Sequence, residues 1–95
     1  FQSLPRLTVF KSSKHLYAQV IEPDGNKVIT SASSHDKSIS EKTSNLKTAE
    51  KIGQLIAERA LENGIKKVVF DRSGYLYHGK IKMIAESARS SGLEI

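Results

Sequence analysis

Hydrophobic and polar residues alternate in three short segments over the first third of the chain. The segments 6-RLTVF-10 and 16-LYAQVIE-22 alternate imperfectly but are rich in β-branched and aromatic residues, which favours strands. The polar residues 11-KSSK-14 between them are typical of a hairpin turn. The Pro, Asp and Gly of 23-PDGN-26 indicate a tight turn before a third strand, 27-KVITSAS-33. The pattern therefore predicts a three-stranded antiparallel meander.

A helical spacing replaces this alternation further along the chain. The Ser-rich segment 34-SHDKSISEKTSN-45 has no clear period, so we interpret it as a loop that leads to a helix cap at Thr43, Ser44 or Thr48. The segment 46-LKTAEKIGQLIAERALENG-64 is the predicted helix, and its last glycine offers the left-handed conformation that ends helices. Its apolar face consists of Ala49, Ile52, Leu55, Ile56 and Ala60. Gly53, inside this helix, indicates close packing, which we expect to be against the sheet.

The last third of the chain predicts a strand, a loop and a second helix. The run 66-KKVVFD-71 is nearly all apolar, as expected for a strand buried on both faces of a mixed sheet. After the loop, a helical spacing up to Gly92 is set by Ile81, Ile84, Ala85 and Ala88. Residues 93–95 are expected to add a last short pairing.

These elements, in the order β-β-β-α-β-α, predict an α/β fold. A three-stranded antiparallel meander is followed by helix, strand and helix, and a mixed sheet packs against the two helices. At 95 residues we expect a single domain, residues 1–95. No apolar run approaches the ~20 residues of a membrane span, so no membrane partner is expected. The chain begins at Phe1 without an initiator Met, which we interpret as a truncation.

The net charge of the chain indicates which kind of partner it binds. The chain has 15 Lys and Arg against 10 Asp and Glu, a net charge of +5 and a pI near 9.6, which favours phosphate-rich partners. The excess of basic residues lies in residues 1–40 and 65–95, whereas residues 41–64 are balanced. The chain has no Cys, which excludes a disulfide framework and a thiolate metal site.

One motif resembles a phosphate-binding loop. Gly74, Gly79 and Lys80 have the G-x-x-x-x-G-K spacing between a predicted strand and helix. The motif requires Ser or Thr next, to bind Mg²⁺, and here that position is Ile81. The residues between the glycines are bulky: Tyr75, Leu76, Tyr77 and His78. A small nucleotide-binding enzyme that uses this loop therefore remains only an alternative hypothesis.

Other catalytic and metal chemistry has weaker support. The three His residues are His15, His35 and His78, with Ser12, Ser13 and Asp36 close in sequence to the first two. Catalytic triads are defined by geometry rather than by sequence proximity, and no helical H-x-x-x-H pair is present. No catalytic residue, metal ligand or cofactor is predicted.

Two clusters have the residue types that bind RNA. Arg and Lys suit phosphates, Tyr and His suit base stacking or 2′-hydroxyl contacts, and Ser and Gly allow close backbone approach. The first cluster is Arg6, Lys11, Ser12, Ser13, Lys14, His15 and Tyr17. The second, which opens the last helix, is Arg72, Ser73, Gly74, Tyr75, Tyr77, His78, Gly79, Lys80 and Lys82.

Simpler explanations apply to several of these residues. Lys11 and Lys14 fit ordinary solvated turn charges equally well, and Tyr17 on a strand is more often part of the core or of the sheet surface. Lys47 and Lys51 look like part of a solvated helix face and are assigned no site. A protein-interaction module that uses the amphipathic helix around Ile56 is a further alternative.

The two clusters fall within blocks of a known family. The blocks 6-RLTVFKSSKHLYAQVI-21 and 68-VVFDRSGYLYHGK-80 resemble the bacterial-type large-subunit ribosomal protein eighteen, which binds 5S ribosomal RNA, and the similarity runs from about Pro5 to Ile95. Family members usually have a strongly basic tail before the first block, and almost none of it is present here.

The resemblance implies a mixed α/β fold and a structural role without catalysis. It implies that the protein holds 5S rRNA and helps join it to 23S-type rRNA in the central protuberance of the large subunit. Its partners would be these two RNAs and the neighbouring ribosomal proteins, with no small-molecule substrate. It also implies a location in the ribosome, in the bacterial cytoplasm or in a chloroplast or mitochondrion.

Overall fold

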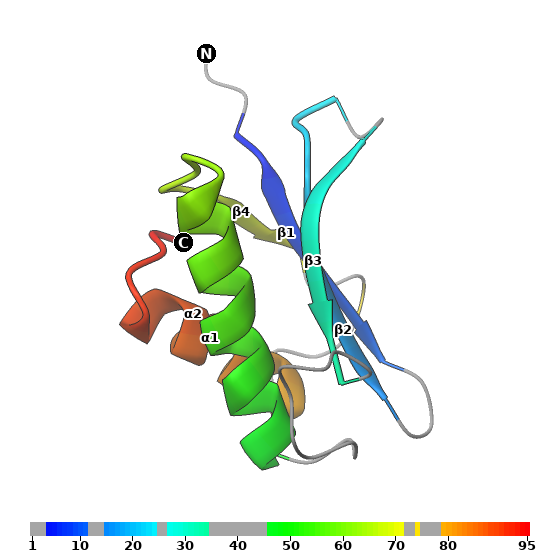
Figure 1. Cartoon of the computed structure of the whole chain (residues 1–95). Coiled ribbons are helices and arrows are strands. Elements are labelled where there is room, and N and C mark those ends of the chain that lie inside the picture. Colours follow the sequence, from blue (N-terminus) through cyan, green and yellow to red (C-terminus); the bar gives the residue numbers. More distant parts are fainter. Residues whose placement is uncertain (1–3, 12–14, 25–26, 35–45, 72–73, 75–78) are drawn as a thin grey trace.

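A single four-stranded sheet and two helices make up the computed structural model, which describes residues 4–11, 15–24, 27–34, 46–71, 74 and 79–95. The elements follow the order β1 (Arg6–Lys11), β2 (Leu16–Ile21), β3 (Val28–Ser33), α1 (Leu46–Glu62), β4 (Val69–Asp71) and α2 (Lys80–Ser90). Figure 1 shows both helices on one side of the sheet. The predicted α/β class and β-β-β-α-β-α order are confirmed.

The meander forms as the alternation predicted. β1 and β2 pair antiparallel from Arg6–Ile21 to Lys11–Leu16, and β2 and β3 pair antiparallel with a register shift between Val20 and Ile21. Because successive side chains of a strand point to opposite faces, the odd-numbered residues of β1 and the even-numbered residues of β2 face the helices. Every buried hydrophobic side chain of these two strands lies on the covered face: Leu7, Val9, Leu16, Ala18 and Val20.

The strand β4 is an edge strand, which corrects one prediction. The sheet order is β3-β2-β1-β4, and β4 pairs only with β1, in parallel, from Arg6–Val69 to Thr8–Asp71. The apolar run suggested a strand buried on both faces. Val68 is 2% exposed, but the next residue, Val69, is 48% exposed, because both described helices lie on the other face of the sheet. The run is therefore buried on one face only.

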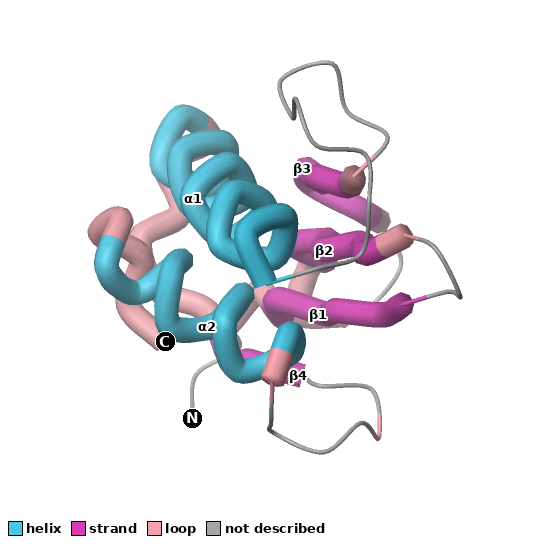
Figure 2. The backbone as a smooth tube through the Cα atoms, turned by 90° about the horizontal axis from the view of Figure 1, so that it is seen from below, coloured by secondary structure: helices cyan, strands magenta, loops and turns pink. Residues whose placement is uncertain are grey.

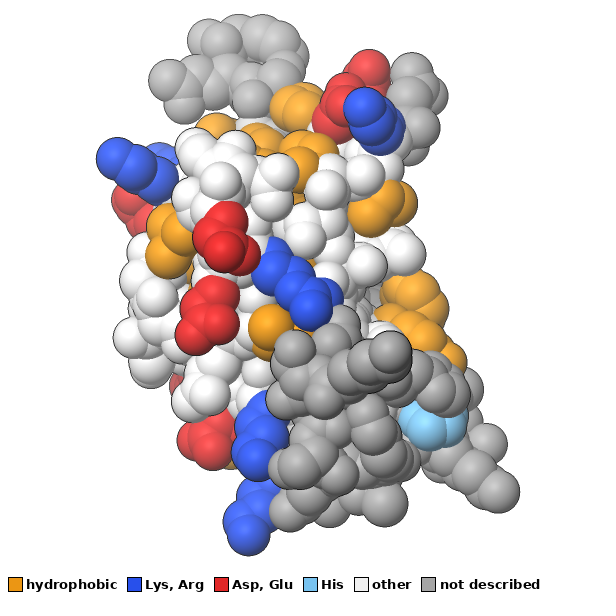
Figure 3. Space-filling view, in the orientation of Figure 1, with side chains coloured by type: hydrophobic (Ala, Val, Ile, Leu, Met, Phe, Trp, Pro, Cys, Tyr) orange, Lys and Arg blue, Asp and Glu red, His pale blue; other side chains and the backbone are white. Residues whose placement is uncertain are grey.

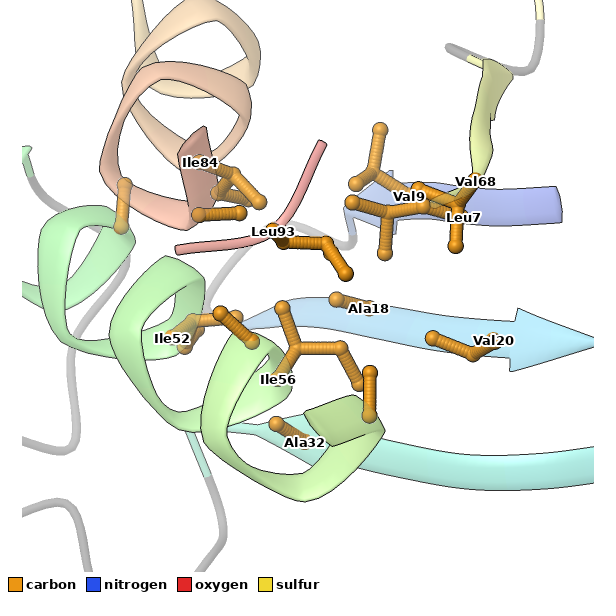
Figure 4. Packing of buried hydrophobic residues seen from close by; sticks show 14 of the residues in the cluster. Leu7, Val9, Ala18, Val20, Ala32, Ile52, Ile56, Val68, Ile84 and Leu93 are labelled. Atoms are coloured by element: carbon orange, nitrogen blue, oxygen red, sulfur yellow. The ribbon is translucent and has the colours of Figure 1, made fainter. Parts of the chain in front are cut away.

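The core fills the space between the sheet and the helices. Figure 4 shows Ile52 and Ile56 of α1, Ile84 of α2 and the side chains of the sheet directed toward one another. Leu93, close to the C-terminus, is 1% exposed and completes this layer. Its position is fixed by a parallel bridge between Lys67 and Glu94, which confirms the expected last pairing. Within the described residues, no helix is long and apolar enough to cross a membrane.

The two helices pack most closely at Gly53. A Cβ atom at this position would lie 2.5 Å from the carbonyl oxygen of Ile84 and 2.6 Å from Cβ of Ser87. The Ser87 hydroxyl also donates a hydrogen bond to the carbonyl oxygen of Glu50, at 2.5 Å. Gly53 therefore permits contact with α2 and not with the sheet, contrary to the sequence-based expectation. Periodicity revealed the close approach but could not reveal the partner.

Replacing Gly53 tests this contact between the helices. We expect Gly53→Ala to lower the free energy of unfolding by about 1–3 kcal/mol, because the added methyl group overlaps backbone and Cβ atoms of α2. Urea unfolding monitored by circular dichroism gives the value. Gln54→Ala, at the next, exposed position of α1, is the matched control and should change stability by less than about 0.5 kcal/mol. Equal stabilities for the two variants would contradict the proposed overlap.

Candidate nucleic-acid interface

Three strand ends and two helix starts lie at the same end of the molecule. β1 and β4 are parallel neighbours, and β3 runs in the same direction because two antiparallel pairings separate it from β1. β1 ends at Lys11, β3 ends at Ser33, and β4 ends earlier, at Asp71, level with Thr8 of β1. The chain enters α1 at Leu46 and α2 at Lys80. We call this region the loop end. It is the lower part of Figure 1, and Figure 2 views the molecule from it.

Lysine residues occupy both helix starts at the loop end. The first turn of α1 has Lys47, the first turn of α2 has Lys80 and Lys82, and neither turn has an acidic residue. Helix N-termini have a partial positive charge, so acidic residues are the ones that stabilise them. Here the positive charges of the lysine side chains add to the partial positive charges of the helix N-termini. Figure 3 shows Lys and Arg side chains at this end of the molecule. The region attracts anions.

The N-terminus of α2 also lacks a side-chain cap. Gly79 occupies the N-cap position with φ 58° and ψ −123°, a conformation that other residues rarely adopt, and no side chain caps the first turn. The carbonyl oxygen of Gly79 accepts the first helical hydrogen bond, from the amide of Met83, at 2.9 Å. Of the second predicted cluster, the structure describes Gly74, Gly79, Lys80 and Lys82. Arg72, Ser73, Tyr75, Tyr77 and His78 lie outside the described residues.

The first predicted cluster is divided in the structure. Lys11 is exposed at the end of β1, and Tyr17 lies in β2 rather than in the turn. Arg6 begins β1, about 17 Å from Lys11 at the usual rise per strand residue, and so does not belong to the loop end. It lies 3.7 Å from the carboxylate of Asp71 in an exposed ion pair. Ser12, Ser13 and Lys14 lie outside the described residues.

His15 has a structural contact that the sequence did not suggest. Its Nδ1 atom lies 2.8 Å from Oγ of Ser34, which is completely buried, and the backbone amide of Leu16 donates to the same Oγ at 3.2 Å. The backbone amide of Ser34 donates to the carbonyl oxygen of Leu16 at 3.0 Å. These bonds join the start of β2 to the end of β3. At least one nitrogen of His15 therefore holds the fold together at the loop end.

The face of the sheet turned away from the two described helices contains an aromatic pair that the sequence revealed only in part. Phe10 and Tyr17 are direct partners across β1 and β2, and their ring centroids lie 4.9 Å apart with planes 16° from parallel. Arg6, Thr8 and Gln19 lie on the same face, which we call the open face. Tyr17 was a predicted site residue, but Phe10 was not, because the register between strands was needed to see the pair.

The structure adds no support for catalysis or a metal site. Within the described part of the chain, no group of three His, Cys, Asp or Glu side chains could hold a metal ion. Arg6, the described cation on the open face, is paired with Asp71. What the described site offers is positive charge, helix N-termini and a ring pair, a combination that suits an extended polyanion with bases.

Comparison with known proteins gives the family. The sequence profile described as ribosomal L18 of archaea, bacteria, mitochondria and chloroplasts matches residues 1–95. Three similar proteins, each named large ribosomal subunit protein uL18, come from Afipia carboxidovorans, Colwellia psychrerythraea and Bacillus cytotoxicus. They are 55%, 52% and 52% identical to the chain. The matches cover 94%, 94% and 95% of the chain, and 77%, 79% and 76% of the relatives.

These matches define the class as that of the ribosomal proteins, which are not enzymes. Within that class, the chain belongs to the ribosomal L18 family. The alternative of a nucleotide-dependent enzyme built on Gly74, Gly79 and Lys80 is thereby overturned. The resemblance on which the sequence analysis relied is confirmed.

The buried hydroxyl of Ser34 gives a test of the contacts at the loop end. We expect Ser34→Ala to lower the free energy of unfolding by about 1–3 kcal/mol, because the amide of Leu16 loses a buried acceptor. Thermal or urea unfolding measures the change. Ser31→Ala, at an exposed position of the same strand, should have little effect, since Ser31 accepts the hydrogen bond from Arg59 through its backbone carbonyl oxygen, which the substitution retains. A Ser34→Ala variant as stable as the parent would show that this hydroxyl is dispensable.

The charge at the start of α1 gives a second test. We expect Lys47→Glu to stabilise the free protein by about 0.3–1 kcal/mol at low salt, because it places an acid beside the helix N-terminus and exchanges a like-charge pair with Lys51 for an opposite one. The gain should shrink as salt is added. Unfolding at two salt concentrations measures it. Lys66→Glu, an exposed change outside both helices, is the control. A destabilised Lys47→Glu protein would contradict the electrostatic description of this helix start.

Proposed function

We propose that the protein binds 5S rRNA through its loop end and helps attach it to 23S-type rRNA in the central protuberance. The chain is a structural protein of the large ribosomal subunit, and its partners are rRNA and other ribosomal proteins. The choice of 5S rRNA follows from the family resemblance. The neighbouring proteins of the central protuberance are proposed as its protein partners on the same basis.

The observation that carries this proposal is the arrangement of charge at the loop end. Two helices begin there with lysines and without acids in their first turns, beside the exposed Lys11. Phosphates are the groups that such a surface binds, and folded RNA presents them in a fixed spatial arrangement. Lysines at helix N-termini reduce the stability of the free protein. A bound polyanion would neutralise the lysines and the positive ends of the helix dipoles, so the repulsion in the free protein would be relieved on binding.

The proposed contacts extend to residues on both clusters. We propose that Lys11, Tyr17, Gly74, Gly79, Lys80 and Lys82 contact RNA or shape the backbone beside it. The same role is proposed for the residues outside the described part of the chain: Ser12, Ser13, Lys14, Arg72, Ser73, Tyr75, Tyr77 and His78. His15 is proposed to position the first turn, and Arg6 to act from the open face. Lys47, which the sequence analysis assigned to a solvated face, joins the proposal because of its position.

The domain and its cellular setting complete the proposal. We propose that residues 1–95 form one RNA-binding domain with a single core between sheet and helices. The protein is located in the ribosome. We propose a bacterial ribosome, in keeping with the bacterial relatives, and an organellar ribosome is the alternative, since the family description includes mitochondria and chloroplasts.

Salt dependence of binding tests the proposed surface. The association constant for 5S rRNA should fall steeply with salt, because bound lysines displace counterions from phosphates. We expect Lys82→Ala and Lys47→Ala each to reduce the slope of log K against log salt by up to about 1. Filter binding with the full-length protein over a range of KCl concentrations gives these slopes.

The matched control is Lys67→Ala, at the opposite end of β4. Lys67 is exposed, and its Nζ lies 3.9 Å from a carboxylate oxygen of Glu94. The Lys67→Ala substitution should leave unchanged both the affinity for 5S rRNA and the slope of log K against log salt. Binding to 5S rRNA that is absent, or insensitive to salt, would refute the proposed function. Equal effects of Lys67→Ala and Lys82→Ala would refute the assignment of the loop end.

A further inference from the structure

The stacked rings of Phe10 and Tyr17 form a pair that lies outside the hydrophobic core. Both rings are only half-buried and lie on the open face. Among the described residues, the hydrophobic core and the partly buried hydrophobic side chains packed against it include neither Phe10 nor Tyr17. Figure 3 shows hydrophobic side chains at the surface on the sheet side of the molecule, near a His. The pair is therefore an aromatic surface outside the core.

The position of the pair connects it to the loop end. The register places Phe10 opposite Tyr17 on the rung before Lys11 and Leu16, where β1 ends and β2 begins. Lys11 is exposed and adjacent to Phe10 in the chain, and His15 precedes Tyr17 by two residues. Side chains alternate along β1, so Lys11 and Phe10 leave opposite faces of the strand, and what the rings share with Lys11 is the same end of the paired strands β1 and β2. A nucleotide strand whose phosphates bind at the loop end can reach the rings with its next bases.

The geometry of the rings selects the kind of nucleotide. Side chains of neighbouring strands stand perpendicular to a sheet, so the outer surfaces of the two stacked rings face along the sheet, away from each other. Aromatic surfaces of this kind stack on bases of any sequence. Bases within an A-form duplex are already stacked between neighbours and are closed to such rings. The matching partner is an unpaired base in a bulge, a loop or a strand end.

We propose that the Phe10–Tyr17 pair is a stacking platform for one unpaired base of the RNA that the loop end binds. The proposal rests on the proposed function and adds the recognition element. Charge at the loop end provides salt-dependent attraction to phosphates, and the ring pair adds contact with a base. Because stacking displaces no counterions from phosphates, its contribution is independent of salt. This difference separates the two parts of the surface experimentally.

The experiment compares ring-removing and ring-retaining variants of the full-length protein in 5S rRNA binding. We expect Phe10→Leu and Tyr17→Leu each to weaken binding by roughly 5- to 150-fold, with an unchanged slope of log K against log salt. Phe10→Tyr and Tyr17→Phe should stay close to the parent, since each retains the ring. Ile21→Ala, also half-buried on the open face but at the far end of β2, is the matched control. Thermal unfolding of each variant confirms that it is folded.

A second measurement needs no substitution and serves if a Leu variant is unfolded. Ultraviolet cross-linking of the parent protein to 5S rRNA, followed by trypsin digestion and mass spectrometry, should place a nucleotide on residues 7–11 or 15–27. Cross-links confined to other peptides would overturn the proposal. So would Leu variants that bind with parental affinity.

The outcomes distinguish this inference from the function on which it rests. Salt-dependent binding of 5S rRNA that is unaffected by ring removal leaves the proposed function intact and overturns the stacking platform. Leu variants that bind free RNA normally but assemble poorly with other ribosomal proteins would assign the rings to a protein partner and also overturn it. Absence of binding by the parent protein would refute both.

Discussion

The parallel pairing of β1 with β4 is the constraint on which the arrangement of the molecule depends. Parallel strands cannot be joined by a tight turn, so the chain must cross the sheet before β4, and α1 makes that crossing. The antiparallel meander makes β3 run in the same direction as β1. Three strands therefore run toward the same end of the molecule, although β4 stops at Asp71, level with Thr8 of β1, and the helices that follow β3 and β4 begin at that end (Figure 2). The loop end is a consequence of topology before any side chain is considered.

The lysine side chains at the loop end reduce the stability of the helices in which they lie. α1 has Lys47 in its first turn and α2 has Lys80 and Lys82, whereas the macrodipole favours acids there. α1 forms because Ile52 and Ile56 are completely buried against the sheet, and burial of one such side chain outweighs the few tenths of a kcal/mol at stake in each surface charge. A local conflict of this kind, tolerated by the core, is typical of a functional surface. Here both helix starts have positively charged side chains beside the positive end of the helix dipole. Binding of a polyanion explains this shared charge better than chance placement.

Local patterns in the sequence predicted the elements, and their limits explain the errors. Alternation, helical spacing and one apolar run identified the strands and helices that the structure describes, because burial against a core imposes these patterns directly. An apolar run does not reveal how many faces of a strand are covered, so the predicted burial of 66–71 on both faces is wrong, and Val69 is half-exposed. Local patterns in the sequence also could not predict contacts between segments that are far apart in the chain. The ion pair of Arg6 with Asp71, the hydrogen bonds of Ser34 and the ring pair of Phe10 with Tyr17 all depend on strand register, which only the folded chain defines.

For the candidate site, residue types and family blocks predicted the two cationic turns. They did not group Lys47 with these turns, and they grouped Arg6 with them although it lies at the other end of β1.

The open face and the loop end differ in a way that suggests separate contributions to recognition. On the open face the charge of Arg6 is opposed by Asp71, and the neighbouring Val69 is apolar, so this face adds little net attraction for phosphates. The loop end has lysines without first-turn acids to oppose them. Attraction that depends only on phosphates acts on any RNA, whereas an aromatic surface one residue beyond Lys11 acts only where an unpaired base lies at the right distance from the bound phosphates. A surface with charge alone would bind RNA without selecting its shape. The ring pair provides that selection, because the pairing of β1 with β2 holds the two rings in one place beside the loop end.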